Sequence, residues 1–367
     1  EKSGFYPSNP LNPHSIFRSL DRCLDNVSVM SNDLRRKIII SLVIALLIYV
    51  ALALWSDWQE LTQALSEFPW QWLPLVIGLT LVNYLGRLFK WHWYLRLVGV
   101  VISWKDGSRI FGVGMLIVMT PGKAGEFLKS YMVKNVTGTP MSVTAPVVLA
   151  ERLTDGMAML LLASAGLFIF PDPRARLIAA IVFLGFITFV IIVQFRPLAL
   201  WFLGMAERMP VVKGFAHSLH TLYESSYIIF SPTNLLIAVT IGVLSWSAEG
   251  LAYYIVLVGF GAPAGPETIL VAIFIFCIST VIGAVFALPG GLGGVEGSMV
   301  ALSMRILGLS SATATAAALL TRFCTLWMGV GIGVVSFFLW PELLAGSEEA
   351  ERERARKSLA KAQRSQS

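Results

Sequence analysis

The chain has 367 residues, of which 56% are hydrophobic and only 14% are charged. Soluble domains carry about 25% charged residues, so this composition argues against a water-soluble enzyme and predicts a protein of the lipid bilayer. The net charge of +6 does not indicate nucleic acid, because the basic residues lie beside apolar segments, as topology signals do, and three scattered cysteines give neither a disulfide framework nor a metal-ligand spacing.

Uncharged segments long enough to cross a bilayer recur along the chain. The six predicted spans are residues 38–55, 70–86, 143–170, 177–195, 233–259 and 312–340. Basic residues before the first span and a charged segment after the last predict that both termini are cytoplasmic at a bacterial inner membrane. We expect an N-terminal cytoplasmic lead-in at 1–34, a membrane domain at 35–344 and a charged cytoplasmic tail at 345–367.

The segments before and after the second span are predicted to lie at the two surfaces of the membrane. Trp58, Leu61, Leu65 and Phe68 recur at helical spacing, which indicates a short amphipathic helix at the outer interface. The second span is expected to end at Gly86, because a basic cluster follows it. This cluster is expected to mark the cytoplasmic side and consists of Arg87, Lys90, His92, Arg96, Lys105 and Arg109.

Two segments do not have the pattern of simple crossings. Residues 110–136 form two stretches that are each too short to span at about 1.5 Å per residue, and they are separated by a break at Pro121 and Gly122. We interpret this segment as a re-entrant hairpin. The second break, at 289–291, follows a stretch at 268–288 that is long enough to span, so a crossing and a re-entrant hairpin are both open there.

Matched spacings relate the two halves of the chain. Each half has a Pro-Gly break, then a glutamate, a glycine twelve residues later and an arginine fourteen residues beyond that. The matched residues are Glu126, Gly138 and Arg152 in the first half, and Glu296, Gly308 and Arg322 in the second. Three crossings per half is an odd number, so the second half must enter the membrane from the opposite side. This predicts inverted repeats at about 38–195 and 197–340, a plan on which many transporters build a substrate site.

Ionisable residues at bilayer depth cost roughly 2.5 to 3.5 kcal/mol each, so they persist when they are paired or functional. Arg152 and Arg322 would each lie about 13 to 15 Å into their spans, near the midplane. A guanidinium binds a phosphate through two hydrogen bonds, and open backbone N–H groups follow each Pro-Gly break, so these positions suit an anionic lipid head group. The candidate substrate-binding residues are Arg152, Arg322, Glu126, Glu296, Lys123, Glu151, Asp155, Gly122, Gly290 and Gly291.

Purely structural pairing is the open alternative for these charges. Glu151, Arg152 and Asp155 lie within one turn of a helix, which permits a local salt bridge. There would then be two buried pairs that only tie each hairpin to its span, Glu126 with Arg152 and Glu296 with Arg322. No cofactor is expected, because the glycine run at 290–294 lacks the lysine and the neighbouring strand of a nucleotide-binding loop.

Three stretches resemble a known family. Residues 120–129, 151–155 and 288–297 are similar to motifs of the membrane domain of bacterial lysylphosphatidylglycerol synthases, which also occurs alone in flippase-like membrane proteins. The resemblance covers roughly residues 35–340 and implies a lipid translocase, because in the two-domain members this portion moves an aminoacylated phospholipid between leaflets. The short tail after it leaves no room for the soluble aminoacyl-transfer domain, so the resemblance does not imply a synthase.

We therefore predict an all-α polytopic membrane protein, with about six spans and two re-entrant helical hairpins in inverted repeats. The predicted function is a lipid flippase or scramblase, not an enzyme, for an anionic or aminoacylated phospholipid or a polyprenyl-phosphate-linked lipid. The expected partner is a membrane lipid and not nucleic acid, and a homo-oligomer is left open. Glu126 and Glu296 would orient the arginines or exchange protons. The alternatives are a membrane enzyme acting on a lipid-linked substrate and a non-catalytic partner of a glycosyltransferase.

Overall fold

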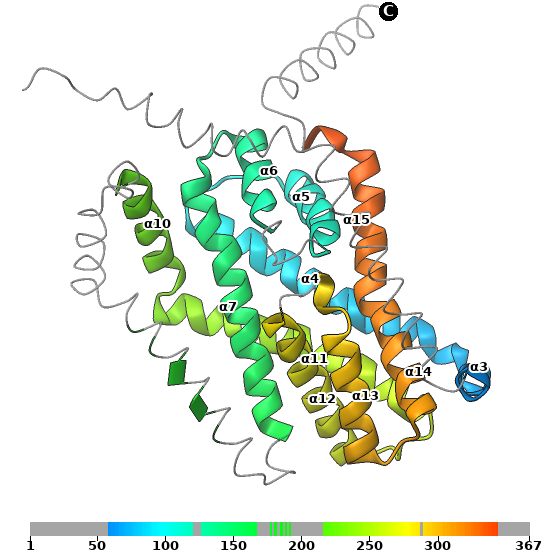
Figure 1. The fold of residues 1–367 in the computed structure, drawn as a ribbon. Helices are drawn as coiled ribbons and strands as arrows, with labels where there is room; N and C mark the ends of the chain where they lie inside the picture. The colour runs from blue at the N-terminus through cyan, green and yellow to red at the C-terminus, as the bar shows by residue number, and fades with distance from the viewer. Residues whose placement is uncertain are drawn as a thin grey trace, which may run out of the picture.

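The computed structural model describes residues 58–119, 126–166, 216–286 and 289–343, together with seven helical positions between 177 and 191 (Figure 1). All regular elements in these ranges are helical, so the predicted all-α fold is confirmed for them. In chain order they are α3 (Trp58–Glu67), η2 (Trp70–Trp72), α4 (Leu73–Leu97), α5 (Trp104–Ile117), α6 (Leu128–Thr137), α7 (Met141–Gly166), α10 (Ala216–Ile229), α11 (Pro232–Gly259), α12 (Pro266–Val285), η5 (Pro289–Gly291), α13 (Gly294–Leu307), α14 (Ser311–Arg322), the π-helical η6 (Phe323–Trp327), α15 (Met328–Leu339) and η7 (Pro341–Leu343).

Four of the described helices are long and apolar enough to cross a membrane. They are Trp70–Leu97, Pro232–Gly259, Pro266–Val285 and Ser311–Leu339. With 26 residues α7 also has the necessary length, but its middle carries Glu151, Arg152 and Asp155, so its composition does not place it among the four. The predicted span at 38–55 and most of the span at 177–195 lie outside the described residues. A polytopic membrane protein is therefore supported, while the count of six spans stays a prediction.

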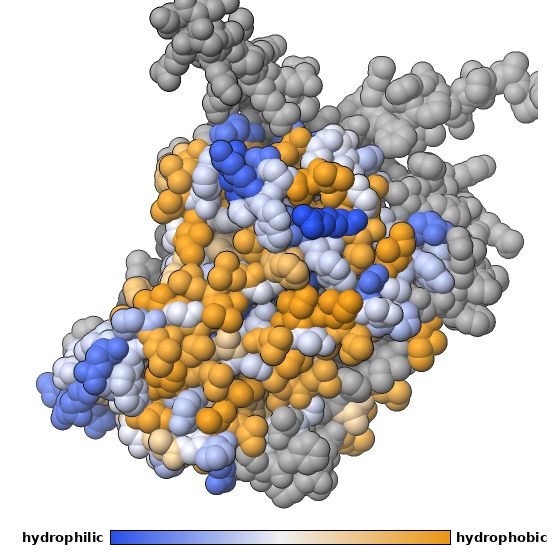
Figure 2. Space-filling model, turned by 180° about the vertical axis from the view of Figure 1, so that it is seen from behind, coloured by the Kyte–Doolittle hydropathy of each residue, from blue (hydrophilic) through white to orange (hydrophobic). Residues whose placement is uncertain are grey.

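Large apolar side chains face outward over much of the molecule. Figure 2 shows a broad apolar zone on one face, with hydrophilic residues gathered above it and on α3 at its left. The exposed apolar residues of α4 alone are Leu75, Leu81, Val82, Leu85 and Phe89. Soluble monomers rarely expose so large a continuous apolar surface, so this zone indicates contact with lipid.

Helix α4 is longer than the sequence predicts. It continues without a break to Leu97, so the predicted end of the second span at Gly86 is wrong. Lys90 and His92 are buried, which contradicts their placement in a cytoplasmic surface cluster. The helix continues because residues such as Trp91 pack in the apolar core and because Lys90 meets an acidic partner from α7. A basic residue therefore indicates a membrane surface only where it does not form an ion pair with a buried acidic residue.

The two halves have the same local structure at the matched residues. In each half a helix ends a few residues before the Pro-Gly pair, a short helix lies after that pair, and a glycine with positive φ ends the short helix before the long one that carries the arginine. These glycines are Gly138, with φ 76°, and Gly308, with φ 67°. Both lie in the left-handed region that favours glycine. The twelve-residue interval after each glutamate is thus the length of one short segment closed by a glycine cap.

We expect Gly308→Ala to lower the free energy of unfolding by about 1 to 2 kcal/mol, because an alanine there must adopt the left-handed conformation. The added Cβ would meet no atom within 4 Å, so the cost is that of the backbone alone. Gly297→Ala within α13 has equally open space and an ordinary helical backbone, and it should be neutral or slightly stabilising. Denaturant unfolding in detergent micelles measures both variants, and equal losses would contradict the cap.

The two halves are arranged in opposite directions. Helices α5 and α6 lie at one end of the molecule and α12 and α13 at the other, while α7 and the α14–α15 helix run between the ends in opposite senses (Figure 1). Helix α5 packs against α15, α12 packs against α7, and α4 packs along α11. Each broken segment thus contacts the long helix of the other half, as an inverted repeat predicts. The re-entrant character of the two segments, which depends on the position of the bilayer, stays a prediction.

The second break lies against the end of α5. The Gly290 N–H donates to the Val118 carbonyl at 3.2 Å. A small apolar cluster surrounds this contact and consists of the buried residues Leu116, Met119, Leu292 and Val330. Residues 120–125, which include the first Pro-Gly pair, lie outside the described residues. These contacts bring the two halves together near the centre of the molecule.

Candidate functional site

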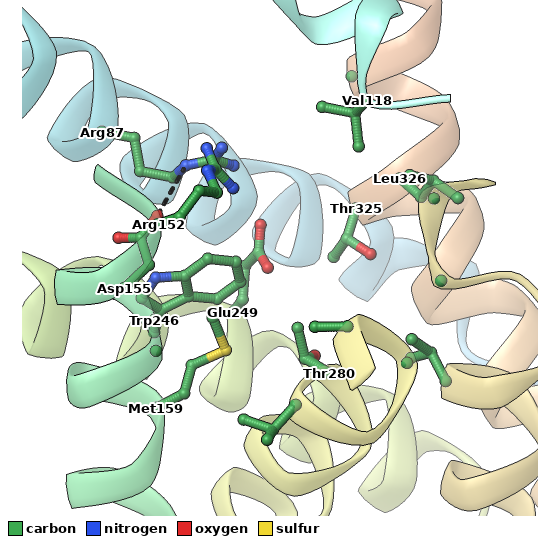
Figure 3. A pocket seen from close by; sticks show the side chains of 18 of the residues that line it. Arg87, Val118, Arg152, Asp155, Met159, Trp246, Glu249, Thr280, Thr325 and Leu326 are labelled. Atoms are coloured by element: carbon green, nitrogen blue, oxygen red, sulfur yellow. Dashed lines mark ion pairs between the residues drawn. The ribbon is translucent and has the colours of Figure 1, made fainter. Parts of the chain in front are cut away.

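A cavity of about 440 Å³ lies where the two halves meet. Its walls come from α4, α5, α6, α7, α11, α12, α13 and the α14–α15 helix, with η5 at one side (Figure 3). Most of the wall is apolar, but seven lining residues carry a charge: Arg87, Glu126, Lys129, Arg152, Asp155, Glu249 and Arg322. An apolar cavity with a few convergent charged groups is typical of a ligand site.

The structure brings six of the ten predicted site residues to this cavity. They are Glu126, Arg152, Asp155, Gly290, Gly291 and Arg322. Glu151 and Glu296 do not line the cavity, but both are fully buried beside it and bind its arginines. Gly122 and Lys123 lie outside the described residues.

Arg152 contacts two glutamates. Its Nε lies 2.9 Å from Glu126 Oε2, and its Nη2 donates to Glu151 Oε1 at 3.1 Å. The Nε contact is an ion pair without the direction of a hydrogen bond, since Arg152 Nε has no hydrogen-bond partner. The other oxygen of Glu151 accepts from Lys129 Nζ at 2.8 Å. One buried acid of α7 therefore holds two cations and ties α6 to α7.

Arg322 makes the equivalent contact in the second half and also holds the glycine turn. Its Nε donates to Glu296 Oε1 at 2.7 Å, and its Nη2 donates to the Gly290 carbonyl at 2.6 Å. Glu296 Oε2 in turn accepts from the Gly293 N–H at 2.7 Å. The glutamate–arginine pairs that the sequence left as an alternative are thus present in both halves. These pairs do not remove the arginines from the cavity, because Arg152 and Arg322 both still line it.

Asp155 has its main partner on another helix. Its Oδ1 accepts from Lys90 Nζ of α4, and its Oδ2 lies 3.9 Å from Arg87 Nε. Within the described part of the chain Asp155 does not pair with Arg152, so the local salt bridge between these two residues is not formed. Both charged groups of the Lys90–Asp155 pair are buried. This ion pair therefore connects α4 to α7 behind the cavity.

Arg87 lines the cavity, although the sequence analysis assigned it to a surface cluster. Its guanidinium carbon lies 5.5 Å from the centre of the Trp246 ring. The nearest carboxylates, Glu151 and Asp155, are both at 3.9 Å, and Arg87 makes no hydrogen bond to any described residue. A guanidinium carries five N–H donors, so this side chain keeps its hydrogen-bonding capacity for a ligand. Its partners lie on other helices, so no local feature of the sequence distinguishes Arg87 from the basic residues that follow it.

Glu249 of α11 is a second cavity residue that the sequence analysis left out of the site. It is 4% exposed and lines the cavity. Figure 3 shows its carboxylate pointing into the cavity, toward the space between Arg152 and Thr325. No ion pair or hydrogen bond joins it to another described residue, although Arg87 and Arg322 lie near enough to act on its charge. Only the approach of α11 to α4 and α14 places it there.

The cavity reaches the outer surface at the end of α12. Val285 lines the cavity and is 78% exposed, and its neighbour Phe286 is 63% exposed. Behind them α12 and α13 pack closely, because a Cβ added at Gly283 would lie 2.3 Å from Val295 Cγ2. The polar interior and the apolar outer face of the molecule are therefore adjacent at this point.

Comparison with known proteins assigns most of this chain to a known type of membrane domain. Residues 38–333 match the profile of the lysylphosphatidylglycerol synthase TM region. Two proteins of Methanothermobacter thermautotrophicus, each named UPF0104 membrane protein, are similar over most of their length. One is 23% identical over 332 residues, which cover 83% of this chain and 96% of the relative. The other is 25% identical over 325 residues, which cover 80% of this chain and 90% of the relative.

Proposed function

The chain belongs to the family of the lysylphosphatidylglycerol synthase TM region, and from this premise we propose that it is a flippase or scramblase for a lipid with an anionic head group. The observation that carries the proposal is one cavity lined by three arginines from both halves of the chain. We place the protein in a bacterial inner membrane with both termini on the cytoplasmic side, as the distribution of its basic residues predicts.

The arginines suit a phosphate better than other ligands. Arg87, Arg152 and Arg322 reach the cavity from α4, α7 and α14. A phosphodiester presents oxygens that match the planar fork of a guanidinium, and it remains charged as the arginines do. Arg87 is the first contact, because none of its donors is used by a described residue. Glu126 and Glu296 hold the other two arginines in place through their Nε atoms.

The shape of the site favours a lipid over a free anion. A volume of about 440 Å³ fits a head group and not its acyl chains. Because Val285 lies both on the cavity wall and on the apolar outer surface, the acyl chains remain in the bilayer while the head group is bound. Two halves of opposite direction offer equivalent routes to the two leaflets, as in transporters with inverted repeats.

We expect Arg87→Gln to slow lipid translocation about tenfold or more, because a hydrogen bond between charged groups is worth about 1.5 to 3 kcal/mol. The measurement is the access of dithionite to fluorescent phosphatidylglycerol in liposomes that contain the full chain. Folding should change little, since the ion pairs of Arg87 are long. Arg96→Gln is the matched control, because Arg96 lies on the same helix, is exposed and does not line the cavity.

Wild-type rates in Arg87→Gln would overturn the site, and the absence of translocation by the wild-type chain for phosphatidylglycerol would overturn this choice of lipid. Mass spectra of the recovered lipid should show no covalent change. A modified lipid would favour the alternative of a membrane enzyme that uses the buried carboxylates as acid and base.

A further inference from the structure

Glu249 is the exception among the carboxylates in and beside the cavity. The charged residues in and beside the cavity are five cations, Arg87, Lys90, Lys129, Arg152 and Arg322, and five carboxylates, Glu126, Glu151, Asp155, Glu249 and Glu296. Each carboxylate except Glu249 has a cation within 3.1 Å. Within the described residues no cation contacts Glu249 at ion-pair distance. The set is neutral only while Glu249 is ionised.

The groups that face Glu249 come from each helix packed against α11. They are Tyr84 and Arg87 of α4, Asp155 and Arg152 of α7, Cys277 of α12 and Arg322 of α14. No described side chain of α10 lines the cavity. Burial in the largely apolar space opposes the negative charge of Glu249 most strongly, while Arg87 and Arg322 favour that charge and Asp155 opposes it. The two arginines that stabilise Glu249 are therefore also two that the proposed phosphate would occupy.

A bound phosphate changes the balance at Glu249. The phosphate pairs with Arg87 and Arg322, so these arginines stabilise the charge of Glu249 less than before. The phosphate also adds a second negative charge to the same small, largely apolar space. Two like charges in such a space do not both stay ionised, and the weaker acid binds the proton. A carboxylic acid is a weaker acid than a phosphodiester, so the proton belongs on Glu249. The protonated side chain can then donate its O–H to a phosphate oxygen.

We propose that Glu249 takes up one proton from water when an anionic head group binds, so that head group and proton cross the membrane together. This inference rests on the proposed function and adds that the movement of the lipid is coupled to the movement of a proton. The proton compensates the single negative charge of the head group, so the occupied site has the same net charge as the empty one. A difference in pH across the membrane then biases the direction of lipid movement.

Calorimetry of the full chain in detergent tests this directly. Soluble dihexanoylphosphatidylglycerol is titrated into the protein in two buffers of equal pH and different ionisation enthalpy, and the difference in heat gives the protons bound per lipid. At a pH high enough to ionise Glu249 in the empty site, we expect about one proton per lipid for the wild type and for Glu249→Asp, and about none for Glu249→Gln. Glu267→Gln is the matched control, because Glu267 is exposed at the start of α12 and should behave as the wild type.

The outcomes separate this inference from the function on which it rests. Lipid binding by the wild type without proton uptake, or equal uptake by Glu249→Gln, would overturn the role of Glu249 and leave the lipid site standing. Absence of binding by the wild type would overturn both. The wild-type titration alone decides the proton count if the glutamine variant does not fold.

Discussion

Replacement of Arg322 by glutamine is expected to remove about 3 to 5 kcal/mol from the free energy of unfolding and to abolish lipid translocation. Glu296 is fully buried and would lose the guanidinium that lies 2.7 Å from its Oε1. The Gly290 carbonyl would lose the donor at 2.6 Å, which loosens the turn at the second break. Denaturant unfolding in micelles gives the stability, and the dithionite assay gives translocation.

Two matched variants show whether the buried charge causes this loss. The double variant Glu296→Gln and Arg322→Gln should recover part of the stability, because it leaves no carboxylate without a cation, while translocation stays lost. Arg152→Gln should cost less than Arg322→Gln, because the Arg152 side chain is 25% exposed whereas that of Arg322 is 9% exposed. A cost for Arg322→Gln below about 1 kcal/mol would place that pair among ordinary surface salt bridges.

Lys90→Met is expected to lower the free energy of unfolding by about 3 to 5 kcal/mol, because it leaves Asp155 buried without its close cation. Arg87 remains at 3.9 Å and cannot replace the lost contact without moving. The change is measured by the same unfolding experiment. It tests whether the extension of α4 into the core is anchored by this ion pair.

The controls for Lys90 use the same substitution elsewhere and the removal of both charges. Lys105→Met replaces an exposed lysine near the start of α5 and should change stability by no more than about 0.5 kcal/mol. The double variant Lys90→Met and Asp155→Leu should recover most of the loss, since an apolar pair of similar volume needs no counter-charge. Similar effects of Lys90→Met and Lys105→Met would mean that the Lys90–Asp155 pair does not stabilise the fold.

Local features of the sequence were sufficient for the class of protein and for the order of its helices. Apolar runs predicted α11 and the α14–α15 helix closely, because the length of a span follows from bilayer thickness. The glycines at positions 138 and 308 predicted equal segments in the two halves, and both are left-handed caps. The length of a segment between a turn and a helix cap can be predicted from sequence, because the turn and the cap each depend only on residues close by in the chain.

Contacts between distant residues account for the failures. The end of α4 was predicted at Gly86 because basic residues follow, but Lys90 binds Asp155, 65 residues away. Arg87 and Glu249 were left out of the site for the same reason, since neither has a local partner that identifies it. The pairing of Glu126 with Arg152 was an open alternative, and nothing in the sequence could show that a cavity and a salt bridge would occur together.

The amino-acid sequence alone determines that this chain lies in a membrane, where its helices break and that its buried charges need partners, because these properties depend on the composition and spacing of nearby residues. Tertiary packing alone decides which partners they take. A charge buried in an apolar medium is stabilised by a counter-charge. Which of several possible counter-charges it pairs with depends on which helices pack against each other. The packing of α4, α7, α11 and α14 around one cavity makes that choice, and it leaves Arg87 and Glu249 available there.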